Sequence, residues 1–186
     1  MKRALVMLAA AAALVAFPDS ARAQQPADGG LRIGLRLGAY FPTDSDVSER
    51  FGDVIPIVGI ARAMPPRPGS FSLFPSLEIS GASSGSDRFL IIPLTLVGEY
   101  QLPVTGVVVP FVRAEGGIAY YDYRIRLDSA NTARGREFGP AAAVEAGVIA
   151  TQHLRLSGRY RIFQSYEGFN FSGLELNAVI GSLRIF

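Results

Sequence analysis

Alternation of apolar and polar residues runs through most of the chain and constrains its fold more than any other feature. In residues 31–41, every second residue is leucine, isoleucine, alanine or phenylalanine, and arginine, glycine and tyrosine lie between them. Residues 153–163 repeat this pattern, and residues 71–80 and 90–100 follow it closely. A period of two predicts β-strands with one apolar face each. Less regular strands are expected at about 54–64, 107–126, 138–151 and 171–186, which makes eight.

The connections between these segments alternate in length. The long, polar connections are Pro42–Gly52, Ser80–Asp87 and Leu127–Glu137. The short ones are Pro65–Gly69, Leu102–Thr105 and Thr151–Gln152. Short turns at one end of a sheet and longer loops at the other are typical of up-and-down transmembrane barrels. The sequence therefore predicts an all-β fold, an eight-stranded antiparallel up-and-down transmembrane β-barrel.

The first residues have the pattern of a secretory signal peptide. Lys2 and Arg3 precede the apolar run Ala4–Phe17, and Ala21-Arg22-Ala23 supplies small residues at the positions that a signal peptidase reads. The run is shorter than the about 20 residues that a membrane-spanning helix needs. We therefore expect residues 1–23 to be removed as a signal peptide and residues 24–186 to form the barrel domain.

Charge and cysteine content exclude several classes of function. Without residues 1–23 the chain keeps 15 arginines and 15 acidic residues, so it is nearly neutral, and no basic run indicates a nucleic-acid partner. Cysteine is absent, which excludes disulfides, thiol nucleophiles and cysteine-ligated metals.

The polar faces of the expected strands carry few charges, and the two signs nearly balance. A sparse, balanced set of this kind fits a narrow barrel interior in which side chains pair, and it would leave the apolar faces in contact with lipid. The expected interior charge network is Arg36, Glu78, Glu99, Arg113, Glu115, Glu145, Arg155, Arg159, Arg161 and Glu175. In this arrangement Glu99 is expected to form one interior pair. The opposite arrangement, a soluble periplasmic barrel that binds an apolar ligand inside, is the alternative.

Aromatic and proline residues bear on this arrangement in opposite directions. Aromatic residues fall near the ends of the expected strands, where membrane barrels have aromatic girdles. They are Tyr40, Phe41, Tyr100, Phe111, Tyr120, Tyr121, Tyr160 and Phe163. Prolines inside or near the expected strands conflict with a closed barrel, since proline cannot donate a ladder hydrogen bond. They are Pro56, Pro75, Pro93, Pro110 and Pro140.

No arrangement of residues predicts a catalytic, cofactor or metal site. His153 is the only histidine, and a serine–histidine–acid site built on it would lie at the short-turn end, with Glu145 on the adjacent strand as its only evident acid. The acidic segment Thr43–Glu49 lacks the spacing of a calcium loop, and Asp46 is better interpreted as the N-cap of a helical turn. Arg134 and Arg136 in the third long connection could contact lipopolysaccharide phosphates.

The mature chain resembles the small outer-membrane β-barrel superfamily that includes the OmpA-type membrane domain, the OmpW-type proteins and the opacity-type proteins. The resemblance is carried by the signal peptide, the first strand Leu31–Pro42 and the last strand, which ends in Phe186. It implies a place in the outer membrane of a Gram-negative cell, with membrane lipid and lipopolysaccharide as partners. It also implies that the barrel assembly machinery reads the segment that ends in Phe186.

The function expected from these observations is that of a non-enzymatic structural or surface component, or of a narrow porin-like conduit. A lipid-modifying barrel enzyme is a further alternative, because several small barrels of this class modify lipids. No cofactor is expected.

Overall fold

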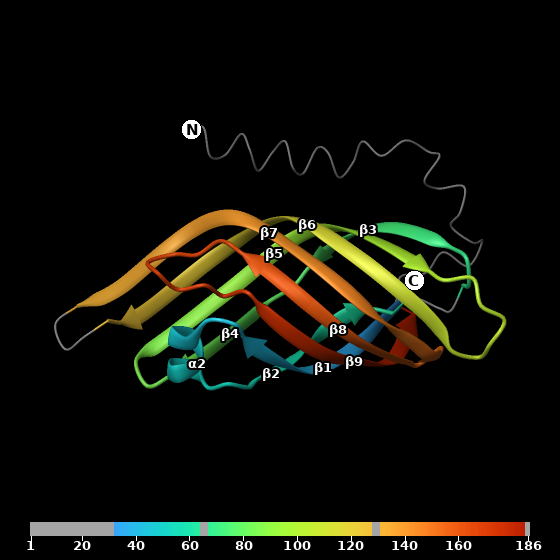
Figure 1. Ribbon diagram of the computed structural model, residues 1–186, viewed down its shortest axis with the longest axis horizontal. Coiled ribbons are helices and arrows are strands. Elements are labelled where there is room, and N and C mark those ends of the chain that lie inside the picture. Colours follow the sequence, from blue (N-terminus) through green and yellow to red (C-terminus); the bar gives the residue numbers. More distant parts are fainter. Residues whose placement is uncertain (1–31, 64–66, 128–130, 185–186) are drawn as a thin grey trace. The chain divides into compact units, whose positions relative to one another are not determined.

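The computed structural model describes residues 32–63, 67–127 and 131–184. These residues form one curled antiparallel sheet and one short helix (Figure 1). The elements are β1 (Arg32–Pro42), α2 (Ser45–Phe51), β2 (Ile55–Arg62), β3 (Phe71–Leu77), β4 (Ser80–Ser84), β5 (Asp87–Gln101), β6 (Val109–Arg126), β7 (Thr132–Thr151), β8 (Leu154–Phe163) and β9 (Gly173–Arg184). The expected signal peptide and Phe186 lie outside the described residues. No helix among the described residues is long and apolar enough to cross a membrane.

Neighbouring strands of the sheet are mostly consecutive in the chain. Their order is β2-β1-β9-β8-β7-β6-β5-β3, and β4 pairs with β5 beside β3. Every pairing is antiparallel, and β1 pairs with β9, so the first and last strands of the sheet are adjacent. This confirms the all-β, antiparallel, up-and-down fold that the alternation predicts.

Strands β3 and β4 are two halves of one strand, which Pro93 on β5 interrupts. Leu77 pairs with Leu94, and Ser80 pairs with Ile91, so both halves keep one register against β5. Between them, the Glu78 N–H donates to the Pro93 carbonyl at 3.2 Å. Proline has no N–H to return the bond. The nine strands therefore occupy eight places in the sheet, as expected.

The other four prolines lie at positions where the strand has no hydrogen-bonded neighbour on one side, or close to a strand end. Pro56 and Pro75 lie in β2 and β3, the two strands at the ends of the sheet order. Pro110 is the second residue of β6, and Pro140 precedes Ala141, where the ladder between β7 and β8 begins. Proline is tolerated at sheet edges and strand ends, which accounts for residues that the sequence could not reconcile with a barrel.

Side chains, rather than a backbone ladder, bridge the seam between β2 and β3–β4. In the described part of the chain no hydrogen-bonded pairing joins these strands, and residues from both sides line shared grooves. The Arg62 guanidinium on β2 lies 4.7 Å from the centre of the Phe74 ring on β3. Arg36 on β1 reaches Glu78, between β3 and β4, at 2.8 Å. The Arg62 contact joins the edge strands β2 and β3 directly, and the Arg36 ion pair joins β1 to the β3–β4 junction.

Two of the predicted long connections are largely strand. Ser80–Asp87 comprises β4 and a tight turn at Gly85 and Ser86, so the prediction of a long connection there is wrong. In Leu127–Glu137, β7 already begins at Thr132 and pairs with β6. The strand extends into the expected connection because Ala133 there forms an apolar, buried cross-strand pair with Ile125 of β6.

The two ends of the sheet differ. The helix end carries α2, the β4–β5 turn, the β6–β7 hairpin tip and the β8–β9 connection. The turn end carries the β5–β6 connection, the β7–β8 turn and Arg32 at the start of β1. Figure 1 shows α2 at the same end as the last residues of β6 and the first residues of β7.

Candidate functional site

The apolar and polar faces of the strands point in opposite directions, and the charged face points into the curl. On β8, Leu156 and Ile162 expose 44% and 51% of their surface, whereas Arg159 exposes 2%. Strands β1 and β5 alternate in the same way: Leu35 and Leu37 are exposed and Arg36 is buried, and Glu99 is buried beside exposed Tyr100. The structure places nine of the ten residues of the expected interior charge network among the buried residues, and the side chain of Glu78 exposes 10%.

Nearer the turn end, Glu99 is the centre of one group of ion pairs. It binds Arg113 at 2.7 Å and Arg155 through two bonds of 2.8 and 2.9 Å. Arg113 also donates to Glu145 at 2.9 Å. The Arg155 guanidinium lies 4.1 Å from the centre of the Phe111 ring. Glu99 therefore joins two arginines from two other strands, so the expectation of one pair is wrong.

Arg159 is the centre of a second group of ion pairs, which links four strands and the β3–β4 junction. It contacts Glu78 at 2.8 Å, Glu115 at 2.5 Å and Glu175 at 3.7 Å. Glu78 also binds Arg36 and Arg161, and Arg161 lies 2.7 Å from Glu175. With the Glu99 group, this network comprises five arginines and five glutamates.

The network is neutral as a whole, and each member has a partner of opposite charge. Because the charges are buried and paired, their main effect is to fix the packing of the strands that carry them. A paired carboxylate whose oxygens accept from guanidinium groups is poorly suited to act as a free general base. The geometry therefore favours a structural role for the interior.

An apolar cluster fills the helix end of the interior. Val47 of α2 is fully buried, and Phe51 packs edge-on against Phe89, with 5.0 Å between ring centres. Phe89 also contacts Phe171, at 4.9 Å. The remaining members of the cluster include Tyr40, Ile55, Ile91, Tyr121, Tyr123, Ile125, Phe163 and Phe169.

Half of the predicted aromatic girdle belongs to the interior instead. Tyr40, Phe111, Tyr121 and Phe163 are buried, and none of them exposes more than 8% of its surface. They occupy inward-facing positions of their strands. The prediction used only their nearness to strand ends, which does not tell on which face of the strand a residue lies. Tyr100 and Tyr160 are exposed, as a girdle requires.

The connection that contains α2 covers the apolar cluster and is tied to its neighbours. Asp44 caps the helix by accepting from the backbone of Asp46 and Val47, so Asp46 is not the N-cap. The Asp44 carboxylate also accepts from the Asn170 N–H at 3.0 Å, and Arg50 pairs with Asp87 at 3.2 Å. These contacts fix α2 to the β8–β9 connection and the start of β5.

His153 lies apart from Glu145, the acid expected to orient it. His153 is exposed in the β7–β8 turn, where its backbone N–H donates to the Thr151 hydroxyl. Glu145 lies in the interior and binds Arg113. Among the described residues, no three His, Cys, Asp or Glu side chains are grouped to hold a metal ion.

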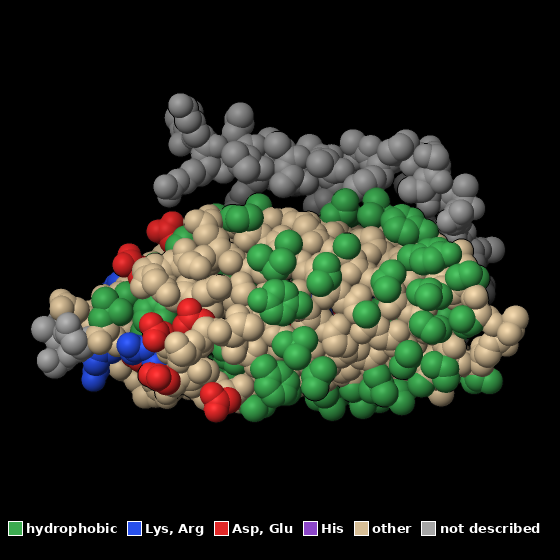
Figure 2. All heavy atoms as spheres, viewed as in Figure 1, with side chains coloured by type: hydrophobic (Ala, Val, Ile, Leu, Met, Phe, Trp, Pro, Cys, Tyr) green, Lys and Arg blue, Asp and Glu red, His purple; other side chains and the backbone are tan. Residues whose placement is uncertain are grey.

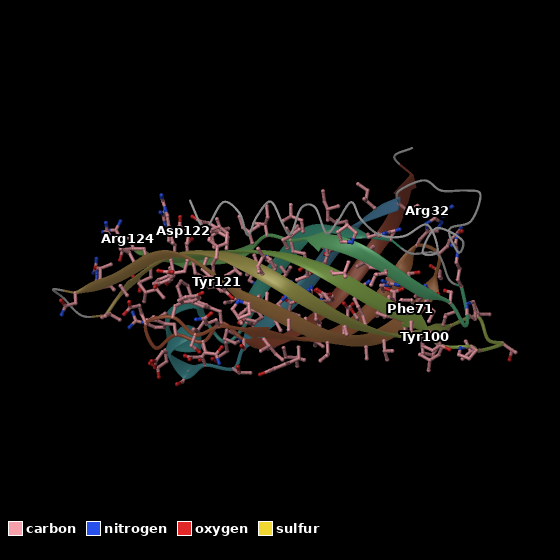
Figure 3. All side chains as sticks on the ribbon, turned by 90° about the horizontal axis from the view of Figure 1, so that it is seen from above. Arg32, Phe71, Tyr100, Tyr121, Asp122 and Arg124 are labelled. Carbon is pink, nitrogen blue, oxygen red and sulfur yellow. The ribbon has the colours of Figure 1, made fainter. Side chains whose placement is uncertain are left out.

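The outer surface carries an apolar band bounded by aromatic pairs. Figure 2 shows hydrophobic side chains spread over most of one face, with the charged groups gathered towards the helix end. At the turn end, Phe71 and Tyr100 are cross-strand partners (Figure 3), and both are exposed. Nearer the helix end, Tyr120 and Phe138 pair with 5.2 Å between ring centres.

Comparison with known proteins supports the fold and nothing finer. No protein-family model matches the sequence, and no curated protein matches it. Among solved structures, the crystal structure of Neisserial surface protein A is similar, with a TM-score of 0.50 and 11% sequence identity. The match covers 83% of this chain and 96% of that chain. It supports the small outer-membrane β-barrel fold that the sequence predicts.

Proposed function

We propose that the protein is an integral outer-membrane β-barrel that serves as a structural or surface component of the cell envelope. The observation that carries this proposal is the inversion of the usual arrangement of a soluble protein. Ionisable side chains pair inside the curled sheet, while leucine, isoleucine and valine cover its outside. Water penalises a large exposed apolar surface, whereas lipid favours it.

The dimensions of the apolar surface support the same proposal. A tilted strand needs about 9–11 residues to cross the hydrocarbon core. Outward-facing residues are free of charge from Leu90 to Tyr100 on β5, from Val112 to Tyr120 on β6 and from Phe138 to Ala150 on β7. Each of these stretches is long enough to span the core. A soluble barrel that binds an apolar ligand would instead need these uncharged faces inside and the charged faces outside.

Cell fractionation tests this proposal. When the full chain is expressed in a Gram-negative host, we expect the protein in the outer-membrane fraction, resistant to alkaline carbonate and extracted by detergent. A soluble periplasmic protein in the same cells serves as the control, because carbonate releases it. Recovery of folded protein free in the periplasm would contradict the proposal.

The filled interior favours a structural or surface role over that of a conduit. Paired charges occupy the half near the turn end, and aromatic residues beneath α2 occupy the other half. We expect the folded protein in planar bilayers to show no steady ion conductance, while a trimeric porin in the same bilayers conducts. Stable, uniform conductance steps from the purified protein would instead support a narrow conduit.

The proposal contains neither catalysis nor a cofactor. His153 lacks an orienting acid in the described structure, and the interior carboxylates are bound to arginines. Membrane lipid is the proposed partner of the outer surface. The barrel assembly machinery, which the resemblance implies reads the segment ending in Phe186, is the proposed partner during insertion.

A further inference from the structure

Three arginines form a lateral row on the outer surface of β5, β6 and β7. Arg88 pairs in register with Arg124, and Arg124 pairs with Arg134. Residues paired in this way share a face of the sheet, with their Cβ atoms about 4.5–5.5 Å apart. All three are exposed. This row, Arg88–Arg124–Arg134, is called the arginine row below.

The arginine row has no counter-charge among the described residues. None of its three guanidinium groups makes an ion pair or a side-chain hydrogen bond there. The nearest acid on the same face, Asp122, is bound to Arg136 at 3.4 Å. Like charges directly opposite each other destabilise a sheet. An external anion that bridges the three guanidinium groups would remove this repulsion.

The position of the row indicates where that anion would come from. Below it along the strands lies the Asp122–Arg136 pair, and below that lies the Tyr120–Phe138 pair at the upper border of the apolar band. Figure 3 shows Asp122 and Arg124 at the helix end of β6, remote from Phe71 and Tyr100. Transmembrane barrels place their short turns in the periplasm and their longer connections outside the cell, so the helix end would face outward. In that orientation the row lies where the headgroups of the outer leaflet begin.

We propose that the arginine row binds the phosphorylated headgroup of an outer-leaflet glycolipid of the lipopolysaccharide type, while the acyl chains of the lipid lie on the apolar band below. This inference rests on the proposed function. Guanidinium groups suit phosphate because they donate two parallel bonds to its oxygens. Continuity between the row and the band favours a lipid over a free anion, since one molecule can contact both surfaces.

Thermal unfolding in detergent micelles tests the inference. Folded protein, detected by its altered mobility in SDS gels, is titrated with diphosphorylated lipid A, with its dephosphorylated form and with inorganic phosphate. We expect diphosphorylated lipid A to raise the midpoint of unfolding, and the other two probes to do so weakly or not at all. In the triple variant Arg88→Gln, Arg124→Gln, Arg134→Gln, the apparent affinity for this lipid is expected to fall about tenfold or more.

The matched control is the variant Arg32→Gln, Arg67→Gln, which removes charge at the turn end and is expected to bind the lipid as the wild type does. Equal stabilisation of the wild type and the triple variant would overturn the inference. So would equal effects of lipid A with and without phosphate, or of inorganic phosphate alone. Failure of the wild type to fold in micelles or membranes would contradict the proposed function itself.

Discussion

Replacing Arg159 with methionine is expected to destabilise the folded barrel by about 3–5 kcal/mol, because removal of one partner leaves a buried charge uncompensated. Glu78 and Glu175 would each keep an arginine, since both also contact Arg161. Glu115 would not. Among the described residues its remaining side-chain contact is the Thr95 hydroxyl, at 3.4 Å. Most of the loss should therefore arise at Glu115.

A second substitution separates this cause from simple loss of packing. Adding Glu115→Gln to Arg159→Met removes the buried carboxylate charge that has lost its arginine. The double variant should therefore recover a large part of the lost stability. Arg136→Met is the control, because its ion pair with Asp122 is exposed and worth less than about 1 kcal/mol. Unfolding in phospholipid vesicles is followed by gel mobility. Tryptophan fluorescence cannot be used, because the chain has no tryptophan. Equal losses for Arg159→Met and Arg136→Met would contradict a buried network.

The second large effect concerns the outer surface. Leu94 lies near the middle of β5, faces outward and pairs with Ile118 of β6 and Leu77 of β3. Leu94→Arg is expected to cost about 2–4 kcal/mol of stability in vesicles, the cost of an arginine at the bilayer midplane.

The control for this prediction lies on the same sheet but outside the apolar band. Thr132 is the first residue of β7 and is exposed beside the hairpin tip at the helix end. Thr132→Arg should change stability by less than about 1 kcal/mol, because the cost falls towards the interface. Equal costs at both positions would indicate that the band does not contact lipid.

Much of the fold followed from alternation, because a strand has a period of two and each face has one environment. The opposite faces of residues 31–41, 90–100 and 153–163 could be assigned from the sequence, and β1, β5 and β8 have those faces. The antiparallel up-and-down arrangement followed from the same pattern together with the connections.

Other features depend on pairing between distant residues, which the sequence does not display. Nothing in residues 71–84 shows that Pro93 on another strand divides them into β3 and β4. The double pairing of Glu99 likewise needs Arg113 and Arg155 to converge from β6 and β8. Spacing predicted an interior carboxylate there but not the number of its partners.

The arginine row shows how polar composition misled the assignment of a connection. Arg134 and Arg136 were expected in a loop because residues 127–137 are polar and charged. Polar residues on an exposed face are compatible with a strand, and the inward residues Ile125 and Ala133 sustain the hairpin. Only the resulting register brings Arg134 beside Arg124 and Arg88.

The central claim is that the apolar face of the sheet contacts lipid while the interior is filled. Because the chain contains no cysteine, spin labels can be attached to single cysteines placed at Leu94, Thr95, Leu96 and Val97 in vesicles. At Leu94 and Leu96, membrane-dissolved oxygen should relax the label strongly and a water-soluble nickel complex weakly. At Thr95 and Val97, which are buried, neither agent should have much effect. Strong relaxation by the nickel complex at Leu94 and Leu96 would contradict the account, because those positions would then face water.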